Sequence, residues 1–257
     1  MKRKIIIFMV IAMTLSTLSM AQDATAISKK SGDMISLSAL EMTSTLKIYN
    51  EKGNERIRKM ATATKKFGDI TKMMMKFTEP ADVKGTALLV YDYENKNDDM
   101  WIYMPALRKS RRIVSSEKGK NFMGSEFTNA DMSKPNMTDF NFKITGEEFI
   151  DTKKYWIIES TPKTPVLENE YGFSRKIARI DQLNYLTLSM EYYDIGGKLL
   201  RIQTIKDYKK QSNGSYFAYY MEMKNLQNGR KSVMTIDQFQ PGSSMTEAQF
   251  SPAMLEQ

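Results

Sequence analysis

The sequence predicts a mainly β protein in which about a dozen short strands form an antiparallel sheet. Three observations support this prediction. Apolar or alternating runs of a strand's length follow one another from residue 41 to residue 239. Most of these runs end at Gly, Asn, Asp or Pro, which are typical turn residues. None of the joints holds the helical insert of about 10–15 residues that would indicate a parallel sheet.

The first 21 residues have the features of a secretory signal peptide. A basic start at residues 2–4 precedes the apolar stretch 5–13, and Ser19 and Ala21 form the small-x-small pattern that precedes cleavage. The alternative is a membrane anchor, but the apolar stretch is shorter than the about 18 residues that a span needs. We therefore expect cleavage after Ala21. The mature chain, residues 22–257, is then an exported, soluble single domain without a lipid anchor, since no Cys follows the cleavage site.

The elements of the mature chain follow from its hydrophobic pattern. A short helix is expected between residues 23 and 40, where apolar side chains are loosely spaced at helical intervals. Several later joints, among them 50–54 and 195–197, contain residues that tolerate a positive φ angle, as hairpin turns require. The strands are predicted at 41–49, 55–64, 70–78, 85–91, 100–104, 109–115, 140–150, 155–160, 171–180, 186–193, 199–208, 216–225 and 231–239.

The alternation fails between Ser116 and Asp139, and this long interruption predicts a functional loop. Connections of that length are uncommon inside compact domains unless they carry a function or are disordered. Phe122, Met123 and Phe127 argue against disorder, because exposed aromatic side chains gain little unless they pack. We therefore interpret the segment as a lid.

Composition excludes several classes of function. The chain has no Cys and no His, so disulfides, thiolate nucleophiles and Ser-His-Asp catalysis are impossible, and zinc and copper lose their preferred ligands. Loss of the three basic leader residues lowers the formal net charge from +8 to +5. This mild excess of positive charge does not indicate nucleic-acid binding. The acidic run 92–99 lacks the glycine and terminal Glu of an EF-hand loop and is interpreted as a polar hairpin tip. We expect no catalytic residue, metal or cofactor.

Two features remain as candidates for binding. Residues 87–90 and 100–104 are apolar on both faces of their strands and need cover on both sides, from a second layer or from a ligand. Methionine is abundant, with 21 residues of which four lie in the leader. Methionine lines surfaces that adapt to apolar ligands, although ordinary core filling is the alternative explanation.

A basic cluster follows Pro105. On an exported protein it favours an anionic partner, either lipid headgroups or an acidic protein surface. The alternative is a solvated strand whose charges are balanced by Glu117, Glu126 and Asp131. The positive side chains of this cluster are Arg108, Lys109, Arg111 and Arg112.

Three blocks of the sequence carry a family resemblance. They are 82–93 (DVKGTALLVYDY), 100–113 (MWIYMPALRKSRRI) and 121–132 (NFMGSEFTNADM). Their order, and the segments MPALRKSRRI and FMGSEF in particular, resemble the bacterial outer-membrane lipoprotein-sorting protein family, the relatives of LolA and LolB. The resemblance implies an incomplete antiparallel β-barrel whose concave apolar face is covered by short helices and loops. It also implies a periplasmic carrier or chaperone of lipid or acylated protein, with relatives that work beside RND-type exporters.

The resulting hypothesis is a non-enzymatic periplasmic carrier, expected to be a monomer, that binds acyl chains in a hydrophobic cavity for transfer to or from the outer membrane. The alternative is an accessory subunit that docks on an RND-type inner-membrane exporter and carries no lipid itself. Alternation along three strands predicts the cavity lining, although a fully packed core is its rival. The predicted lining residues are Leu88, Val90, Met100, Ile102, Met104, Leu186, Leu188, Met190 and Tyr192.

Overall fold

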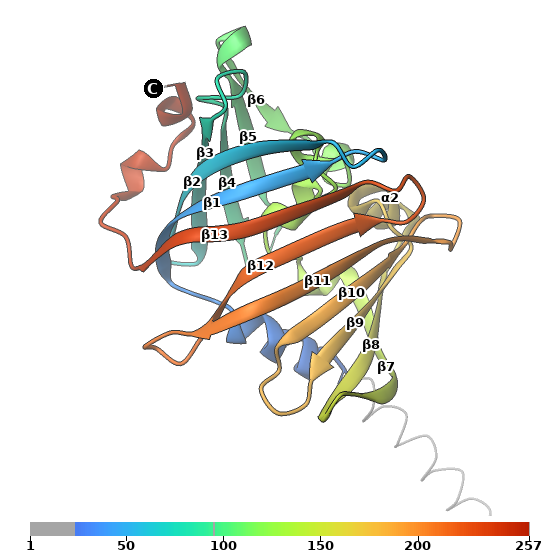
Figure 1. Ribbon diagram of the computed structural model, residues 1–257. Helices are drawn as coiled ribbons and strands as arrows, with labels where there is room; N and C mark the ends of the chain where they lie inside the picture. Colours follow the sequence, from blue (N-terminus) through green and yellow to red (C-terminus); the bar gives the residue numbers. More distant parts are fainter. Residues whose placement is uncertain (1–23, 95, 257) are drawn as a thin grey trace, which may run out of the picture.

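The structure is a computed structural model that describes residues 24–94 and 96–256. The expected signal peptide, residues 1–21, lies outside the described residues. Thirteen strands of the described part form one antiparallel sheet, strongly curved and open along one side (Figure 1). The predicted incomplete antiparallel barrel is therefore confirmed.

The strands lie close to their predicted positions, and their bounds are as follows. The first six are β1 (Ala39–Tyr49), β2 (Glu55–Phe67), β3 (Ile70–Glu79), β4 (Ala87–Tyr93), β5 (Asp99–Met104) and β6 (Lys109–Ile113). The other seven are β7 (Phe140–Ile150), β8 (Lys153–Pro162), β9 (Arg175–Asp181), β10 (Thr187–Tyr193), β11 (Leu199–Lys210), β12 (Tyr216–Asn225) and β13 (Lys231–Pro241).

The order of the strands explains why a long segment crosses the open side. Across the sheet the order is β6-β5-β4-β3-β2-β1-β13-β12-β11-β10-β9-β8-β7. The first and last strands pair in the middle of the sheet, whereas the two edge strands, β6 and β7, are consecutive in the chain. The segment that joins them, which includes the predicted lid, therefore has to pass from one edge of the half-barrel to the other.

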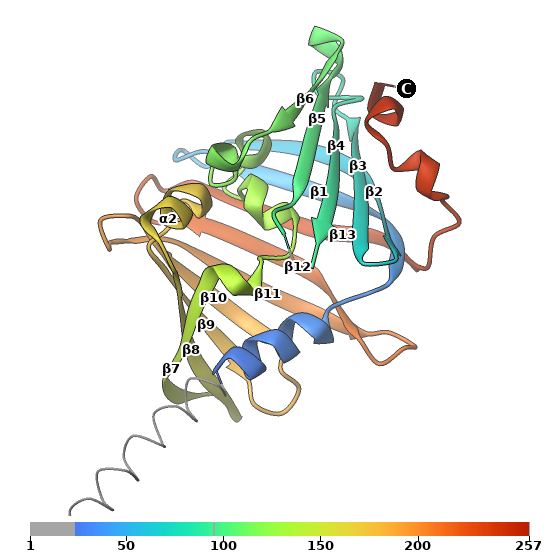
Figure 2. The ribbon, with the colours of Figure 1, turned by 180° about the vertical axis from the view of Figure 1, so that it is seen from behind.

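Two elements cover the concave face (Figure 2). The helix 24–34 lies across one end, where Ala24 packs with Ile158 and Ile180 and the Ser31 hydroxyl lies 3.0 Å from that of Thr187. Residues 116–139, here called the plug, cover the rest with short 3-10 turns, among them Phe122–Gly124 and Asn129–Met132.

One helix departs from the predicted strand pattern. The helix α2 (Pro165–Tyr171) was not predicted, and it ends at the first residue of the strand predicted at 171–180, which begins only at Arg175. The Thr164 hydroxyl accepts a hydrogen bond from Leu167 N–H at 3.3 Å, and Gly172 ends the helix with a φ of 74°. The helix is two turns long, too short for hydrophobic periodicity to identify it.

No helix in the described ranges is both long and apolar enough to span a membrane.

Candidate functional site: the concave face and its plug

The concave face is lined by methionine more than by any other residue type. Ten methionines belong to the central hydrophobic cluster of the concave face or pack against it. Their unbranched, polarizable side chains can adapt to irregular apolar shapes, so the lining can repack around different occupants. These residues are Met60, Met73, Met75, Met100, Met123, Met132, Met190, Met221, Met223 and Met234.

Most of the predicted lining residues lie in this central cluster. Leu88, Val90, Met100, Ile102 and Tyr192 are buried in it, and none of them exposes more than 8% of its surface. The strand pairing brings them together, because β4 and β5 are neighbours while β10 faces them from the other half of the curved sheet.

The remaining predicted lining residues divide into two groups. Met190 packs against the cluster from β10, as the alternation predicts. A β-bulge between Thr187 and Ser189 interrupts that alternation, and single-sequence periodicity contains no signal for a bulge. The residues that lie outside the cluster are Met104, Leu186 and Leu188.

The plug fills the space above the cluster. Phe122 and Phe127 are buried in it, and Met123 is half-buried against it. A tight loop holds these side chains: Phe122 N–H donates to the Phe127 carbonyl at 2.7 Å, and the Ser125 hydroxyl donates to the Phe122 carbonyl at 2.7 Å. Met123 and Gly124, at the turn, have φ angles of 49° and 73°. The glycine adopts this conformation without strain, whereas Met123 does so at some cost.

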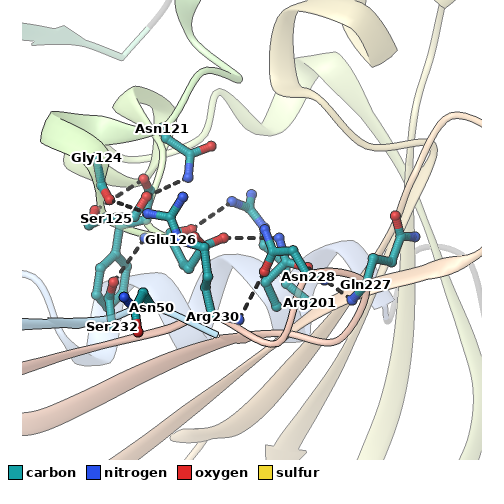
Figure 3. A network of polar contacts seen from close by, with 12 residues as sticks. Asn50, Asn121, Gly124, Ser125, Glu126, Arg201, Gln227, Asn228, Arg230 and Ser232 are labelled. Carbon is teal, nitrogen blue, oxygen red and sulfur yellow. Dashed lines mark hydrogen bonds and ion pairs between the residues drawn. The ribbon is translucent and has the colours of Figure 1, made fainter. Parts of the chain in front are cut away.

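A buried polar network fixes the plug to the sheet (Figure 3). Glu126, which exposes 2% of its surface, accepts a hydrogen bond from Asn225 Nδ2 at 2.9 Å and lies 3.0 Å from Arg230 Nε. Its N–H donates to the Ser232 hydroxyl at 2.9 Å, and Arg230 also donates to the Gly124 carbonyl at 2.7 Å. A carboxylate buried in this way requires its partners, so the plug is held by polar contacts as well as by packing.

A second cation, Arg201, contacts the plug on the side of Tyr192. Its guanidinium donates to the Glu126 carbonyl at 3.1 Å, lies 3.8 Å from Asp131 and sits 4.5 Å from the centre of the Tyr192 ring. Asp131 also accepts hydrogen bonds from the N–H and hydroxyl of Thr128, which forms the cap of a 3-10 turn. Arg201 was not among the predicted site residues, because a single arginine in an alternating strand is indistinguishable from a solvated one.

The other end of the plug rests on two carboxylates of the β4–β5 hairpin. Asp92 accepts a hydrogen bond from Lys134 N–H at 3.3 Å. Burial, together with the like charge of Asp98, raises the pKa of Asp92 to about 6, and burial also raises the pKa of Asp98. This end of the plug is therefore held by groups that titrate.

A groove extends the apolar surface beneath the helix 24–34. It has a volume of about 600 Å³ and is lined by Ile27, Ile144, Trp156 and Tyr185, with Lys30 Nζ 3.9 Å from the centre of the Tyr185 ring. That volume lies within the range of small-molecule sites. The sequence prediction missed this groove because its walls come from the first helix and the β7–β8 edge, which are distant in the chain.

The strands that are apolar on both faces, β4 and β5, are also covered on the outer face of the sheet. Phe250 and Leu255, near the C-terminus, are buried with Leu89 and pack against Trp101 and Tyr103. A second layer of protein therefore covers this face, and the plug covers the inner one.

The basic cluster divides into paired and unpaired charges along the edge strand β6. Arg111 lies 2.7 Å from Glu117, and Arg112 pairs with Asp99. Arg108 and Lys109 are exposed, and the described residues form no ion pair with either. Glu126 and Asp131, which the sequence suggested as balancing charges, pair with Arg230 and Arg201 instead.

Comparisons with known proteins identify the fold and the family. A family model described only as an uncharacterized protein matches residues 69–257. A domain assigned as an outer membrane lipoprotein-sorting protein from Vibrio parahaemolyticus is 26% identical, with a TM-score of 0.85 over 92% of this chain and 100% of that one. The chain belongs to the family whose model matches, and its fold is LolA-like. A DUF1329 family protein from Desulfovibrio piger is 25% identical, with a TM-score of 0.84 over 92% of this LolA-like chain and 99% of that one.

A more distant relative shares the fold of this LolA-like protein. A LolA superfamily protein from Nitrosomonas europaea is 18% identical, with a TM-score of 0.71 over 90% of this chain and 98% of that one. The search of curated proteins gave no significant match. The similarity to the Nitrosomonas europaea structure establishes the half-barrel fold.

Proposed function

We propose that this LolA-like protein is a periplasmic carrier that holds the acyl chains of a lipid or lipoprotein on its concave face during transfer to or from the outer membrane. The observation that carries the proposal is the methionine-rich apolar face beneath a plug that is not part of the sheet. Each buried CH₂ of an acyl chain contributes about 0.8 kcal/mol, so such a surface can bind one without any catalytic group.

Two features support entry of a chain. The groove beneath the helix 24–34 already offers about 600 Å³ beside the inner face of β8. Ala178 of β9, which pairs with Ile158 and Met190, lies between this groove and the central cluster. An acyl chain that displaces the plug can therefore continue from the cluster into the groove.

The proposed function requires no catalytic side chain. The whole sequence lacks Cys and His, and the buried carboxylate Glu126 is engaged with Asn225 and Arg230. Binding and release need only a change in the position of the plug. The role that sequence reasoning kept as an alternative, docking on an RND-type exporter without cargo, has no specific observation in its favour.

Enlarging Ala178 tests the carrier function. Ala178→Trp should fill the passage between the central cluster and the groove and abolish uptake of a fluorescent fatty-acyl probe. The free energy of unfolding should fall by less than the cost of overpacking a filled core, which is about 1–3 kcal/mol. Ile177→Trp is the matched control, since Ile177 points to the outer face of the same strand. Wild-type protein that takes up no acyl probe and co-purifies with no lipid in native mass spectrometry would overturn the carrier function.

Movement of the plug can be measured independently. The described residues contain no cysteine, and the sequence contains none elsewhere, so Met123→Cys introduces a single labelling site in the plug. An environment-sensitive dye at this position should report a more polar surrounding when the acyl probe binds, because the plug leaves its buried position.

A further inference from the structure

One lysine on the concave face has no partner. Lys176 of β9 lies between Ser160 and Tyr192 in the strand pairing, on the same face as the central cluster. Its ammonium group lies 5.9–6.0 Å from the ring centres of Phe140, Phe173 and Tyr192. No described residue accepts a hydrogen bond from it or forms an ion pair with it. A cation among aromatic rings without a carboxylate is unusual, because burial disfavours the charged form.

Arg201 is the second cation at this place. It exposes 5% of its surface, pairs with Tyr192 from the other neighbouring strand, β11, and lies 4.5 Å from the centre of the same ring. Its Nε has no hydrogen-bond partner among the described residues. Burial lowers the pKa of Lys176, and the nearby charge of Arg201 lowers it further. Two cations therefore flank one ring on an otherwise apolar surface.

The plug supplies the negative charge that faces them. Asp131 lies 3.8 Å from Arg201, and its charge also favours protonation of Lys176. The Glu126 carbonyl is the other plug atom that Arg201 contacts. When the plug moves away, both cations lose these contacts and remain on the concave face without an anion.

We infer that Lys176 and Arg201 form a subsite for the anionic headgroup of an acyl-chain ligand, which replaces Asp131 when the plug opens. The inference rests on the proposed carrier function and adds the chemical class of its cargo: an amphiphile with an ionised carboxylate or phosphate beside its acyl chain. Charge-assisted hydrogen bonds from Lys and Arg to such groups are the strong ones in proteins. The tail then lies along Met190 and Ala178, which pair with each other two residues away from the paired Tyr192 and Lys176.

The test compares two probes with the same acyl chain. One is a fluorescent fatty acid, ionised at neutral pH, and the other is its uncharged methyl ester. Wild-type protein should bind the acid about ten-fold more tightly, as expected for one charge-assisted hydrogen bond. Lys176→Met, which keeps the length and apolar stem of the side chain, should remove this preference and leave the affinity for the ester unchanged. Lys143→Met is the matched control, because Lys143 is an exposed lysine of β7.

The outcomes separate the headgroup subsite from the carrier function. Equal binding of acid and ester by the wild type, or an unchanged preference in Lys176→Met, overturns the headgroup subsite and leaves the carrier function intact. Failure of both probes to bind overturns both. Inorganic phosphate, added as a competitor, distinguishes a lipid headgroup from a free anion, and displacement of the fatty acid by phosphate alone would overturn the assignment to a lipid. Lys176→Met should also melt no lower than wild type, since it removes an unpaired cation from an apolar surface.

Discussion

Asp92 and Lys134 illustrate how single residues can link the plug to pH. The Asp92 carboxylate accepts its hydrogen bond from a main-chain N–H of the plug, and its pKa is raised from 3.8 to about 6 by burial and by Asp98. The folded state therefore binds the proton more tightly than the unfolded chain does. Stability from this group is present in full below pH 3.8 and is lost as the pH rises through about 6.

The corresponding prediction is that Asp92→Asn removes this pH dependence. The amide oxygen of Asn can still accept from Lys134 N–H but carries no charge. The variant should melt above wild type at about pH 8, and the two melting temperatures should converge near pH 4. Thermal melts across that range are the measurement, with the exposed Asp69→Asn as a control that should follow wild type at every pH. A constant offset between Asp92→Asn and wild type would contradict the assignment.

Among the single residues of the site, the sequence predicted the apolar ones better than the polar ones. Alternation correctly groups Leu88 with Val90 because a strand's side chains have a period of two. Leu188 lies outside the central cluster, next to the bulge between Thr187 and Ser189, which no local pattern predicts. Lys176 and Arg201 carry no local signal at all, since only the folded sheet brings them to the same ring.

The C-terminal segment is the element that makes the half-barrel's outer face compatible with water. Phe250 is fully buried, its ring packs edge-on against Phe67 at 5.6 Å, and its carbonyl accepts a hydrogen bond from the Tyr91 hydroxyl at 2.6 Å. Lys72 fixes the same segment through Glu247 at 2.8 Å. Without this cover, Leu89 and its neighbours would form an exposed apolar patch.

Phe250→Ala should therefore destabilise the protein by about 3–5 kcal/mol, as truncation of a buried aromatic side chain does. Urea unfolding gives the free energy, and binding of a hydrophobic dye below the transition should rise because the outer face becomes accessible. Ser244→Ala, an exposed residue of the same segment, is the control and should change neither measurement. An unchanged free energy of unfolding for Phe250→Ala would show that the segment does not stabilise the sheet.

The strands were predictable because each is bounded by turn residues and paired with its chain neighbour, so local pattern and global order agree. The pairing of β1 with β13 is the exception, and no local pattern contains it. The plug could be predicted because the alternation of apolar and polar residues stops between Ser116 and Asp139. Its position over the opening follows from β6 and β7 being the two edges, which the sequence alone does not show.

For the whole molecule, the carrier function that we propose also requires contact with the membrane surface from which cargo is taken or to which it is delivered. The edge strand β6 and the turn before it offer a place for this contact. Leu107 exposes 60% of its surface beside Arg108 and Lys109, whose charges are unpaired among the described residues. The combination of an exposed apolar side chain with free cations is suited to an anionic membrane surface.

We therefore expect the double variant Arg108→Glu/Lys109→Glu to bind anionic vesicles at least about ten-fold more weakly than wild type, because each basic residue near such a surface contributes to binding. Binding by wild type should weaken with salt, since the charges are exposed and screened, and the variant should lose that dependence. Lys163→Glu/Lys224→Glu, which changes the net charge equally at two other exposed lysines, is the control and should retain binding. Co-sedimentation with vesicles of neutral and anionic lipid measures all three proteins. If both double variants lose binding equally, net charge governs the interaction, and the cluster beside β6 is not the docking site.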